Sequence, residues 1–225
     1  MKVFLNGGGA GTQTEDAYKR MNHIIDNSKP CLYIPLAMHQ DKYDGCYEWI
    51  RGELKAVNVT DIDMVRSAEE LSSKNLDDYS FIFIGGGNTF KLLNDLKRSG
   101  VFKNILDYID NDGVIFGGSA GAIIFGKDLE ACKLDDDNEV NLKDINGFDI
   151  LNGISIVCHY TNESMDVERK QYLLKLSRHR TVIALPEETT LFFNNNDIEV
   201  IGNKPFHLFD KGKIFEKNVL EKGGF

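Results

Sequence analysis

The chain has 225 residues, of which 42% are hydrophobic and 27% are charged, and its formal net charge is −9. This length and composition suffice for one soluble globular domain with a substantial core. The acidic balance argues against nucleic acid or an anionic membrane surface as the main partner, although it leaves room for a local basic pocket.

Signals for export or membrane insertion are not visible in the sequence. The N-terminal segment lacks the apolar core and cleavage site of a signal peptide, and no stretch approaches the roughly 20 apolar residues of a membrane span. The cysteines, too few for a disulfide framework and without C-x-x-C spacing, are Cys31, Cys46, Cys132 and Cys158. We therefore expect a soluble, reduced, cytoplasmic protein.

Short apolar runs alternate with longer amphipathic segments over the first half of the chain. The expected strands are residues 2–6, 31–37, 59–65, 79–87 and 113–118, and the expected helices are residues 14–27, 42–56, 89–98 and 101–111. Such alternation is typical of strand–helix–strand crossovers, which place a parallel sheet between two layers of helices.

The second half of the chain has a different pattern. Residues 127–150 are polar and acidic and predict a loop long enough to act as a mobile lid. A strand is expected at 154–160 and a helix at 166–178. From residue 181 onward, short β runs alternate with Asn and Gly turns, which indicates antiparallel hairpins. We predict one α/β domain over residues 1–225, with a mostly parallel sheet and antiparallel C-terminal strands at its edge.

Two glycine clusters each follow an expected strand, at the sheet edge where parallel-sheet proteins bind ligands. Neither "NGGGAG" (6–11) nor "GGGNTF" (85–90) contains the Gly-Lys-Ser/Thr of a phosphate-binding P-loop. The first only loosely resembles a dinucleotide-binding pattern and is better interpreted as structural turn glycines. The second would let the backbone approach a ligand and offer N–H groups to an oxyanion.

The stretch "GGSAG" (117–121) matches G-x-S-x-G, the pattern of a nucleophile on a tight strand-to-helix turn. In that geometry the glycines relieve steric clashes and Ser119 projects its hydroxyl from the sheet. The N–H of Ala120 then lies at a helix N-terminus, where a negative oxygen is stabilised. From this motif alone a structural interpretation stays open, in which small residues let a helix pack closely on the sheet.

A nucleophilic serine needs a general base. His159 is the best candidate, because it ends an apolar strand at the edge where parallel-sheet sites form. The other histidines lie on charged helices, in a loop or in a C-terminal hairpin: His23, His179, His39 and His207. Cys158, on the opposite face from His159, is expected to be a buried filler.

The base in turn needs a carboxylate to orient it. Glu187 and Glu188 follow another apolar strand, in "LPEETT". The acidic cluster Asp135, Asp136 and Asp137 is the alternative source, and a solvated loop is the plain explanation of that cluster. The residues alone leave this choice open.

Three motifs occur together in one order and spacing: "FIGGGNTFKLL", "FGGSAGA" and "CHYTN…LPEETT". In combination they resemble peptidase family S51 over roughly residues 1–210. That family contains serine peptidases of the aspartyl dipeptidase type, with cyanophycinase as a relative. The resemblance implies a three-layer α/β sandwich like that of class I glutamine amidotransferases, with serine in place of their cysteine nucleophile.

The same resemblance implies roles for individual residues. Ser119 is expected to be the nucleophile, His159 the base and Glu187 the third member, while Gly87 and Ala120 are expected to supply the N–H groups of an oxyanion hole.

An aspartate in the loop between serine and histidine is the rival third member, and the Asp135–Asp137 cluster corresponds to it. We favour Glu187, because a carboxylate at a strand end holds an imidazole more firmly than one on a mobile loop.

The resemblance also implies a substrate. Enzymes of the aspartyl dipeptidase type release N-terminal Asp from Asp-X dipeptides, which requires a cation near the aspartyl carboxylate. Arg169, in "VERKQYLL", is similar to the arginine that follows the H-x-T-N segment of the family, and Asn88 is expected to contact the substrate. The segment between His159 and Arg169 is shorter than in enterobacterial members, so the sequence does not decide which residues form the pocket for the substrate side chain. The alternative for Arg169 is a solvated charge on the surface of a helix.

We therefore expect a serine peptidase that acts on small peptides without a metal or cofactor, as a monomer or homodimer. One alternative is a cyanophycinase-like enzyme or another amide hydrolase, which would share the triad and reject Asp-X dipeptides. The other alternative is a non-catalytic binding module, against which the retention of Ser119 and His159 argues.

Overall fold

The computed structural model describes residues 1–55, 57–161, 167–195 and 197–218. The apolar runs in its first half form the centre of a large sheet, because strands buried on both faces need helices on either side. Within the described ranges this sheet has seven strands in the order β3–β2–β4–β5–β1–β8–β9. Their bounds are β1 (Lys2–Asn6), β2 (Cys31–Ile34), β3 (Ile62–Met64), β4 (Phe81–Ile84), β5 (Val114–Gly118), β8 (Thr189–Asn194) and β9 (Asp197–Gly202).

The strand directions confirm a mostly parallel sheet with antiparallel C-terminal strands. β3, β2, β4, β5 and β1 run parallel, whereas β8 is antiparallel to β1 and β9 is antiparallel to β8. Asn6, the last residue of β1, lies opposite Gly118 on one side and Thr190 on the other. The carboxyl ends of β1 and β5 therefore meet at one edge, where parallel sheets place their ligand sites.

The expected helices form at the expected places, most of them with shorter ends, and a short helix that the sequence did not predict forms at residues 68–72. The bounds are α1 (Glu15–Asn22), α2 (Tyr43–Lys55), α3 (Ala68–Ser72), α4 (Thr89–Arg98), α5 (Val101–Asp110), α6 (Ala120–Ile123) and α7 (Val167–Leu176). The helix expected at 14–27 ends five residues early, before a turn in which the Asp26 carboxylate accepts hydrogen bonds from the N–H and hydroxyl of Ser28. Such local side-chain bonds compete with helix formation.

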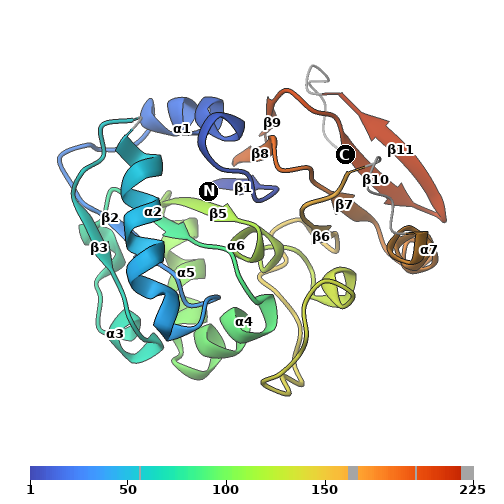
Figure 1. Cartoon of the computed structure of the whole chain (residues 1–225), viewed down its shortest axis with the longest axis horizontal. Helices are drawn as coiled ribbons and strands as arrows, with labels where there is room; N and C mark the ends of the chain where they lie inside the picture. Colours follow the sequence, from blue (N-terminus) through green and yellow to red (C-terminus); the bar gives the residue numbers. More distant parts are fainter. Residues whose placement is uncertain (56, 162–166, 196, 219–225) are drawn as a thin grey trace.

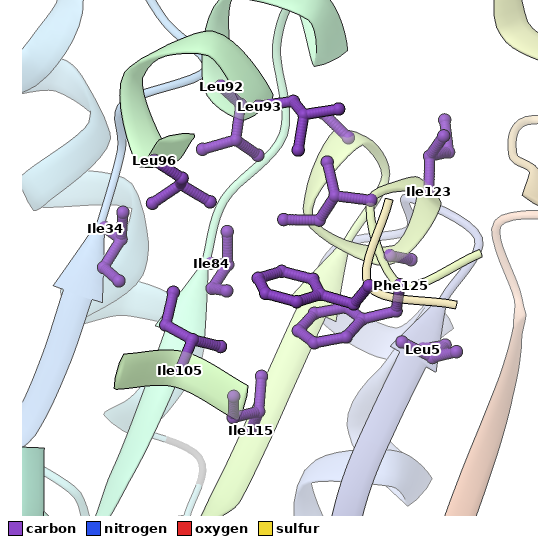
Figure 2. Packing of buried hydrophobic residues seen from close by; sticks show 14 of the residues in the cluster. Leu5, Ile34, Ile84, Leu92, Leu93, Leu96, Ile105, Ile115, Ile123 and Phe125 are labelled. Atoms are coloured by element: carbon purple, nitrogen blue, oxygen red, sulfur yellow. The ribbon is translucent and has the colours of Figure 1, made fainter. Parts of the chain in front are cut away.

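The two faces of the large sheet carry different kinds of side chain. In β4, Ile82 and Ile84 point toward α3, α4, α5 and α6, whereas Phe81 and Phe83 point toward α1 and α2. Figure 2 shows the aliphatic face, on which Ile84 and Ile115 of the sheet lie against Leu96 of α4 and Ile105 of α5. The sheet thus lies between two helical layers, which confirms the three-layer sandwich.

The C-terminal half differs from the expectation in one respect. One α/β domain with a single sheet was expected, but the strand expected at 154–160 pairs in a second sheet of the order β11–β10–β7–β6. The strands are β6 (Ser155–Val157), β7 (Val182–Ala184), β10 (Phe206–Asp210) and β11 (Lys213–Lys217). The reason is that β8 occupies the free side of β1, so β6 pairs in parallel with β7 instead. Figure 1 shows this sheet beside the large one, with α7 packed next to it.

The polar segment 127–150 is anchored at several points. Leu129 and Cys132 are fully buried. The ring of Phe148 stacks on Phe102 at 4.0 Å and on Phe125 at 4.8 Å between centroids. Apolar side chains spaced through the segment therefore hold it against α5 and the end of α6. Its predicted role as a lid stays a prediction.

Two further observations concern the chain as a whole. No helix in the described ranges is long and apolar enough to cross a lipid bilayer. The four cysteines are free thiols, as their number and spacing predict.

The turn after β5 generates a prediction about stability. A Cβ added at Gly121 would lie 2.1 Å from the carbonyl oxygen of Ile84, whereas a Cβ added at Gly118 meets nothing within 4 Å. We expect Gly121→Ala to lower the free energy of unfolding by about 1–3 kcal/mol, the usual cost of overpacking. Gly118→Ala is the matched control and is expected to change it by less than about 0.5 kcal/mol. Denaturant unfolding of both variants measures the difference, and equal losses would contradict the steric argument.

Candidate active site

Ser119 lies on a strained turn between β5 and α6. Its φ of 54° and ψ of −115° are unusual for a residue with a side chain. Its N–H donates to the carbonyl oxygen of Asn6 at 3.1 Å, which ties the turn to β1. A Cβ at Gly117 would lie 2.2 Å from the Gly121 carbonyl oxygen, so the turn closes only with glycine at this position. This backbone is what G-x-S-x-G predicts, and it lifts the serine hydroxyl out of the sheet.

His159 reaches the same point from the second sheet. It follows β6 with a positive φ of 53°, and its N–H donates to the carbonyl oxygen of Gly7 at 3.0 Å. Its Nε2 lies 2.8 Å from Ser119 Oγ, within hydrogen-bond distance. A Cβ at Gly8 would lie 2.2 Å from the imidazole Cε1, so the ring occupies space that a side chain at residue 8 would fill.

Glu187 completes a chain of contacts on the other side of the imidazole. Its Oε1 lies 3.0 Å from His159 Nδ1, and its Oε2 accepts a hydrogen bond from Gln13 Nε2 at 3.0 Å. The contact with His159 first and the bond from Gln13 second hold the pKa of this carboxyl below its usual range. The group therefore stays ionised at neutral pH, in the form that attracts a protonated imidazole.

The rival aspartates form hydrogen bonds elsewhere. Asp135 pairs with Arg169 at 2.9 Å, and burial nevertheless raises the pKa of its carboxyl. The carboxylate of Asp136 accepts hydrogen bonds from the N–H and hydroxyl of Thr89 at the start of α4. Asp137 accepts through its main-chain carbonyl from Asn88. The geometry therefore brings Glu187 to His159 Nδ1, and it gives the three aspartates other partners.

Gly87, on the loop after β4, lines the same pocket as Ser119, and Ala120 follows Ser119 at the first position of α6. Gly87 has a φ of 135°, and a Cβ there would lie 2.5 Å from the Ala37 carbonyl oxygen. In the described part of the chain neither N–H donates a hydrogen bond to another protein group. Neither amide is therefore committed to a hydrogen bond with a described residue, although Ala120 is fully buried, and their role as an oxyanion hole stays a prediction.

A comparison with known families adds independent support for the sequence motifs. The profile of Peptidase family S51 matches residues 3–201, which is most of the chain. The chain belongs to peptidase family S51. The match confirms the family predicted from the three motifs, and with it the prediction of a peptidase.

Curated relatives cover nearly the same span. The Peptidase E of Salmonella arizonae is 27% identical over 220 residues, which cover 93% of this chain and 91% of that protein. The Peptidase E of Salmonella typhimurium is 26% identical over 218 residues, with the same coverage of 93% and 91%.

Two solved structures share the fold. A candidate peptidase E from Listeria monocytogenes superposes with a TM-score of 0.72 at 22% identity, covering 89% of this chain and 98% of that one. A peptidase from an acI-B1 Actinobacterium superposes with a TM-score of 0.76 at 18% identity, covering 100% of this chain and 96% of that one.

The two residues predicted to contact substrate have protein partners in this S51 chain. The guanidinium of Arg169 donates to the main-chain oxygens of Cys158 at 2.6 Å and His159 at 3.3 Å. The Asn88 side chain caps α4, since its Oδ1 accepts from the Lys91 N–H at 2.9 Å. Arg169 therefore holds the backbone that carries His159. Substrate contact by either residue stays a prediction, and Asn162 of the quoted motif lies outside the described residues.

Sequence reasoning missed Asn6 and the first glycine cluster, which it assigned to structural turns. Asn6 is 1% exposed, and its Oδ1 accepts from the N–H groups of Gly8 at 2.8 Å and Gly9 at 3.0 Å. Its Nδ2 donates to Thr190 Oγ1 at 2.9 Å and to the Glu187 carbonyl oxygen at 3.3 Å. The sequence signal that could have identified Asn6 was a polar residue at the end of a buried strand, directly before a run of glycines.

Cys158 was expected to be a buried filler, and its side chain is buried, with 2% of the residue exposed.

The bond from Gln13 to Glu187 generates a prediction about protonation. Gln13→Leu removes the second cause of the lowered pKa and leaves the contact with His159, so the Glu187 pKa should rise toward its ordinary value. The carboxyl would then take up its proton at a higher pH than in the wild type. Carboxyl-carbon NMR titration of Glu187 measures this shift. Gln40→Leu, on the exposed 3₁₀ turn Gln40–Lys42, is the matched control. An unchanged Glu187 titration in Gln13→Leu would contradict the assignment.

Proposed function

We propose that this family S51 chain is a serine peptidase that hydrolyses small peptides through Ser119, His159 and Glu187. The observation that carries the proposal is the unbroken series of contacts from Ser119 Oγ to His159 Nε2, and from His159 Nδ1 to Glu187 Oε1. A serine hydroxyl is a weak nucleophile, and this arrangement is how a peptidase activates it.

The proposed reaction has two halves. His159 Nε2 takes the Ser119 proton as Oγ attacks the peptide carbonyl carbon, and the ionised Glu187 stabilises the resulting imidazolium. The imidazolium then gives its proton to the leaving amine as the C–N bond breaks, which leaves an acyl-enzyme. A water molecule then attacks the ester carbon while His159 takes its proton, and the imidazolium returns that proton to Ser119 Oγ as the acyl–oxygen bond breaks and the carboxylic acid leaves. The Gly87 and Ala120 amides would bind the negative oxygen in both halves, each worth about 10²–10³-fold in rate.

The choice of substrate follows from the family. The relatives named Peptidase E and the resemblance to aspartyl dipeptidases make Asp-X dipeptides the first substrates to test. A cyanophycinase-like or other amide hydrolase would retain the triad and reject these dipeptides. The cytoplasmic location and the monomeric or dimeric state stay predictions.

Removal of the nucleophile tests the proposal directly. Ser119→Ala should lower the hydrolysis of a susceptible dipeptide on the order of 10⁶-fold, because the acyl-enzyme cannot form. Release of free amino acid measures the rate, and a fluorophosphonate probe should label the wild type and not the variant. Ser73→Ala, at an exposed serine after α3, is the control that should retain labelling. Full activity in Ser119→Ala would overturn the proposal.

The choice between carboxylates generates a second prediction. Glu187→Gln removes the charge beside His159 Nδ1 and should lower kcat by as much as about 10⁴-fold, the cost of the analogous change in an aspartate-containing triad. Asp135→Asn should cost far less, because Asp135 pairs with Arg169. Steady-state kinetics of both variants decide between them. A larger loss in Asp135→Asn would assign the third position to the acidic cluster.

A further inference from the structure

The pocket beside Ser119 is lined by five aromatic rings and by glycines. It has a volume of about 490 Å³, within the range of small-molecule sites. Ser119 and His159 are among its lining residues. Its rings belong to α1, α2 and the aromatic face of the sheet: Tyr18, Tyr33, Trp49, Phe83 and Phe116. The ring centroids of Phe83 and Phe116 lie 4.9 Å apart, and those of Trp49 and Phe83 lie 5.9 Å apart. Trp49 is 37% exposed, whereas the other four rings are at most 2% exposed, so Trp49 is the ring that offers most surface to an incoming group.

The polar groups of this pocket are few. The Tyr18 hydroxyl bonds to Glu53 Oε2 at 3.3 Å, and burial raises the pKa of Tyr18 and of Tyr33 well above their usual range. Both phenols are therefore neutral. Among the described lining residues Lys42 is the one Lys or Arg side chain, and it is exposed at the rim. Arg169 does not line this pocket.

We propose that this pocket binds a large apolar side chain of the peptide substrate, of the size of leucine or phenylalanine. The inference rests on the proposed function, because it places that side chain next to the bond that Ser119 attacks. Aromatic walls without a buried cation stabilise an apolar group and leave a carboxylate without a partner. In an Asp-X dipeptide the occupant would be X, on the leaving side of the bond, and in another peptide it would be the residue on the acyl side.

Helix α2 offers a way to fill the pocket without disturbing the core. Gly45 lines the pocket with Trp49, four residues further along the same face of α2, and with Lys42, the last residue of the 3₁₀ turn before the helix. A Cβ at Gly45 meets nothing within 4 Å, and the same holds for Gly52, two turns further along the helix. Gly52 is exposed and is not among the lining residues. Gly45→Leu and Gly52→Leu are therefore a matched pair, of which only the first narrows the pocket.

The first test measures binding without catalysis. Trp49 is the single tryptophan of the chain, so its emission reports on this pocket alone. We would titrate Ser119→Ala protein with Ala-Ala, Leu-Ala, Ala-Leu, Asp-Ala and Asp-Leu. Leucine peptides should shift the emission and bind at least about tenfold more tightly than their alanine counterparts, since one buried methylene alone is worth about 10–200-fold in selectivity. Comparison of Leu-Ala with Ala-Leu identifies the side of the bond.

The second test measures turnover in proteins that retain the triad. Gly45→Leu should lower kcat/KM for the preferred leucine peptide by about tenfold or more and affect alanine peptides much less, whereas Gly52→Leu should match the wild type. Circular dichroism checks that both variants fold. If Gly45→Leu does not fold, the Trp49 titration alone tests whether the pocket binds the leucine side chain.

The failures of the two proposals are distinguishable. If leucine peptides shift the Trp49 emission and the wild type hydrolyses none of them, the pocket assignment stands and the peptidase assignment fails. If the wild type hydrolyses Asp-Ala or Ala-Ala as well as any leucine peptide, and Trp49 does not respond to leucine, the pocket assignment is overturned while the peptidase assignment stands.

Discussion

The site depends on one buried amide, that of Asn6 at the end of β1. Its main-chain oxygen accepts the Ser119 N–H, and its side chain binds the Gly8 N–H and the Glu187 carbonyl oxygen. Leaving the buried polar atoms of Asn6 without hydrogen-bond partners would cost free energy. Its hydrogen bonds therefore stabilise the arrangement in which three different segments lie next to Asn6. The strained serine turn, the glycines next to His159 and the loop between β7 and β8 that carries Glu187 are thereby held around a single residue.

A second constraint comes from the pairing of the strands. Because β8 occupies the place beside β1, the strand that precedes His159 belongs to the smaller sheet, and His159 reaches Ser119 across the boundary between the two sheets. Arg169 secures that arrangement from α7, since its guanidinium binds the main-chain oxygens of Cys158 and His159. Arg169 thus supports the histidine backbone in this chain, and its contact with substrate stays a prediction.

The two faces of the large sheet also have different consequences. The aliphatic face packs fully against α4, α5 and α6, whereas the aromatic face is covered by α1 and α2 and leaves space beside Ser119. Glycines on α2 and after β4 contribute to this space because they carry no side chain to fill it. A peptidase with this arrangement would select substrates through ring surfaces, with Lys42 as the charge at the entrance.

The sequence by itself determined where the central strands and helices lie along the chain, the serine turn and the family. These follow from hydrophobic periodicity and short motifs such as G-x-S-x-G, which are local signals. It also singled out His159 and Glu187, since each closely follows an apolar strand. Only the tertiary structure decided that β6 leaves the large sheet, that Asn6 joins the segments of the site, and that Arg169 binds backbone. It alone revealed the aromatic pocket, whose rings come from α1, α2, β2, β4 and β5. Contacts among side chains so distant in the sequence depend on how the strands pair and the helices pack, and no local pattern records them.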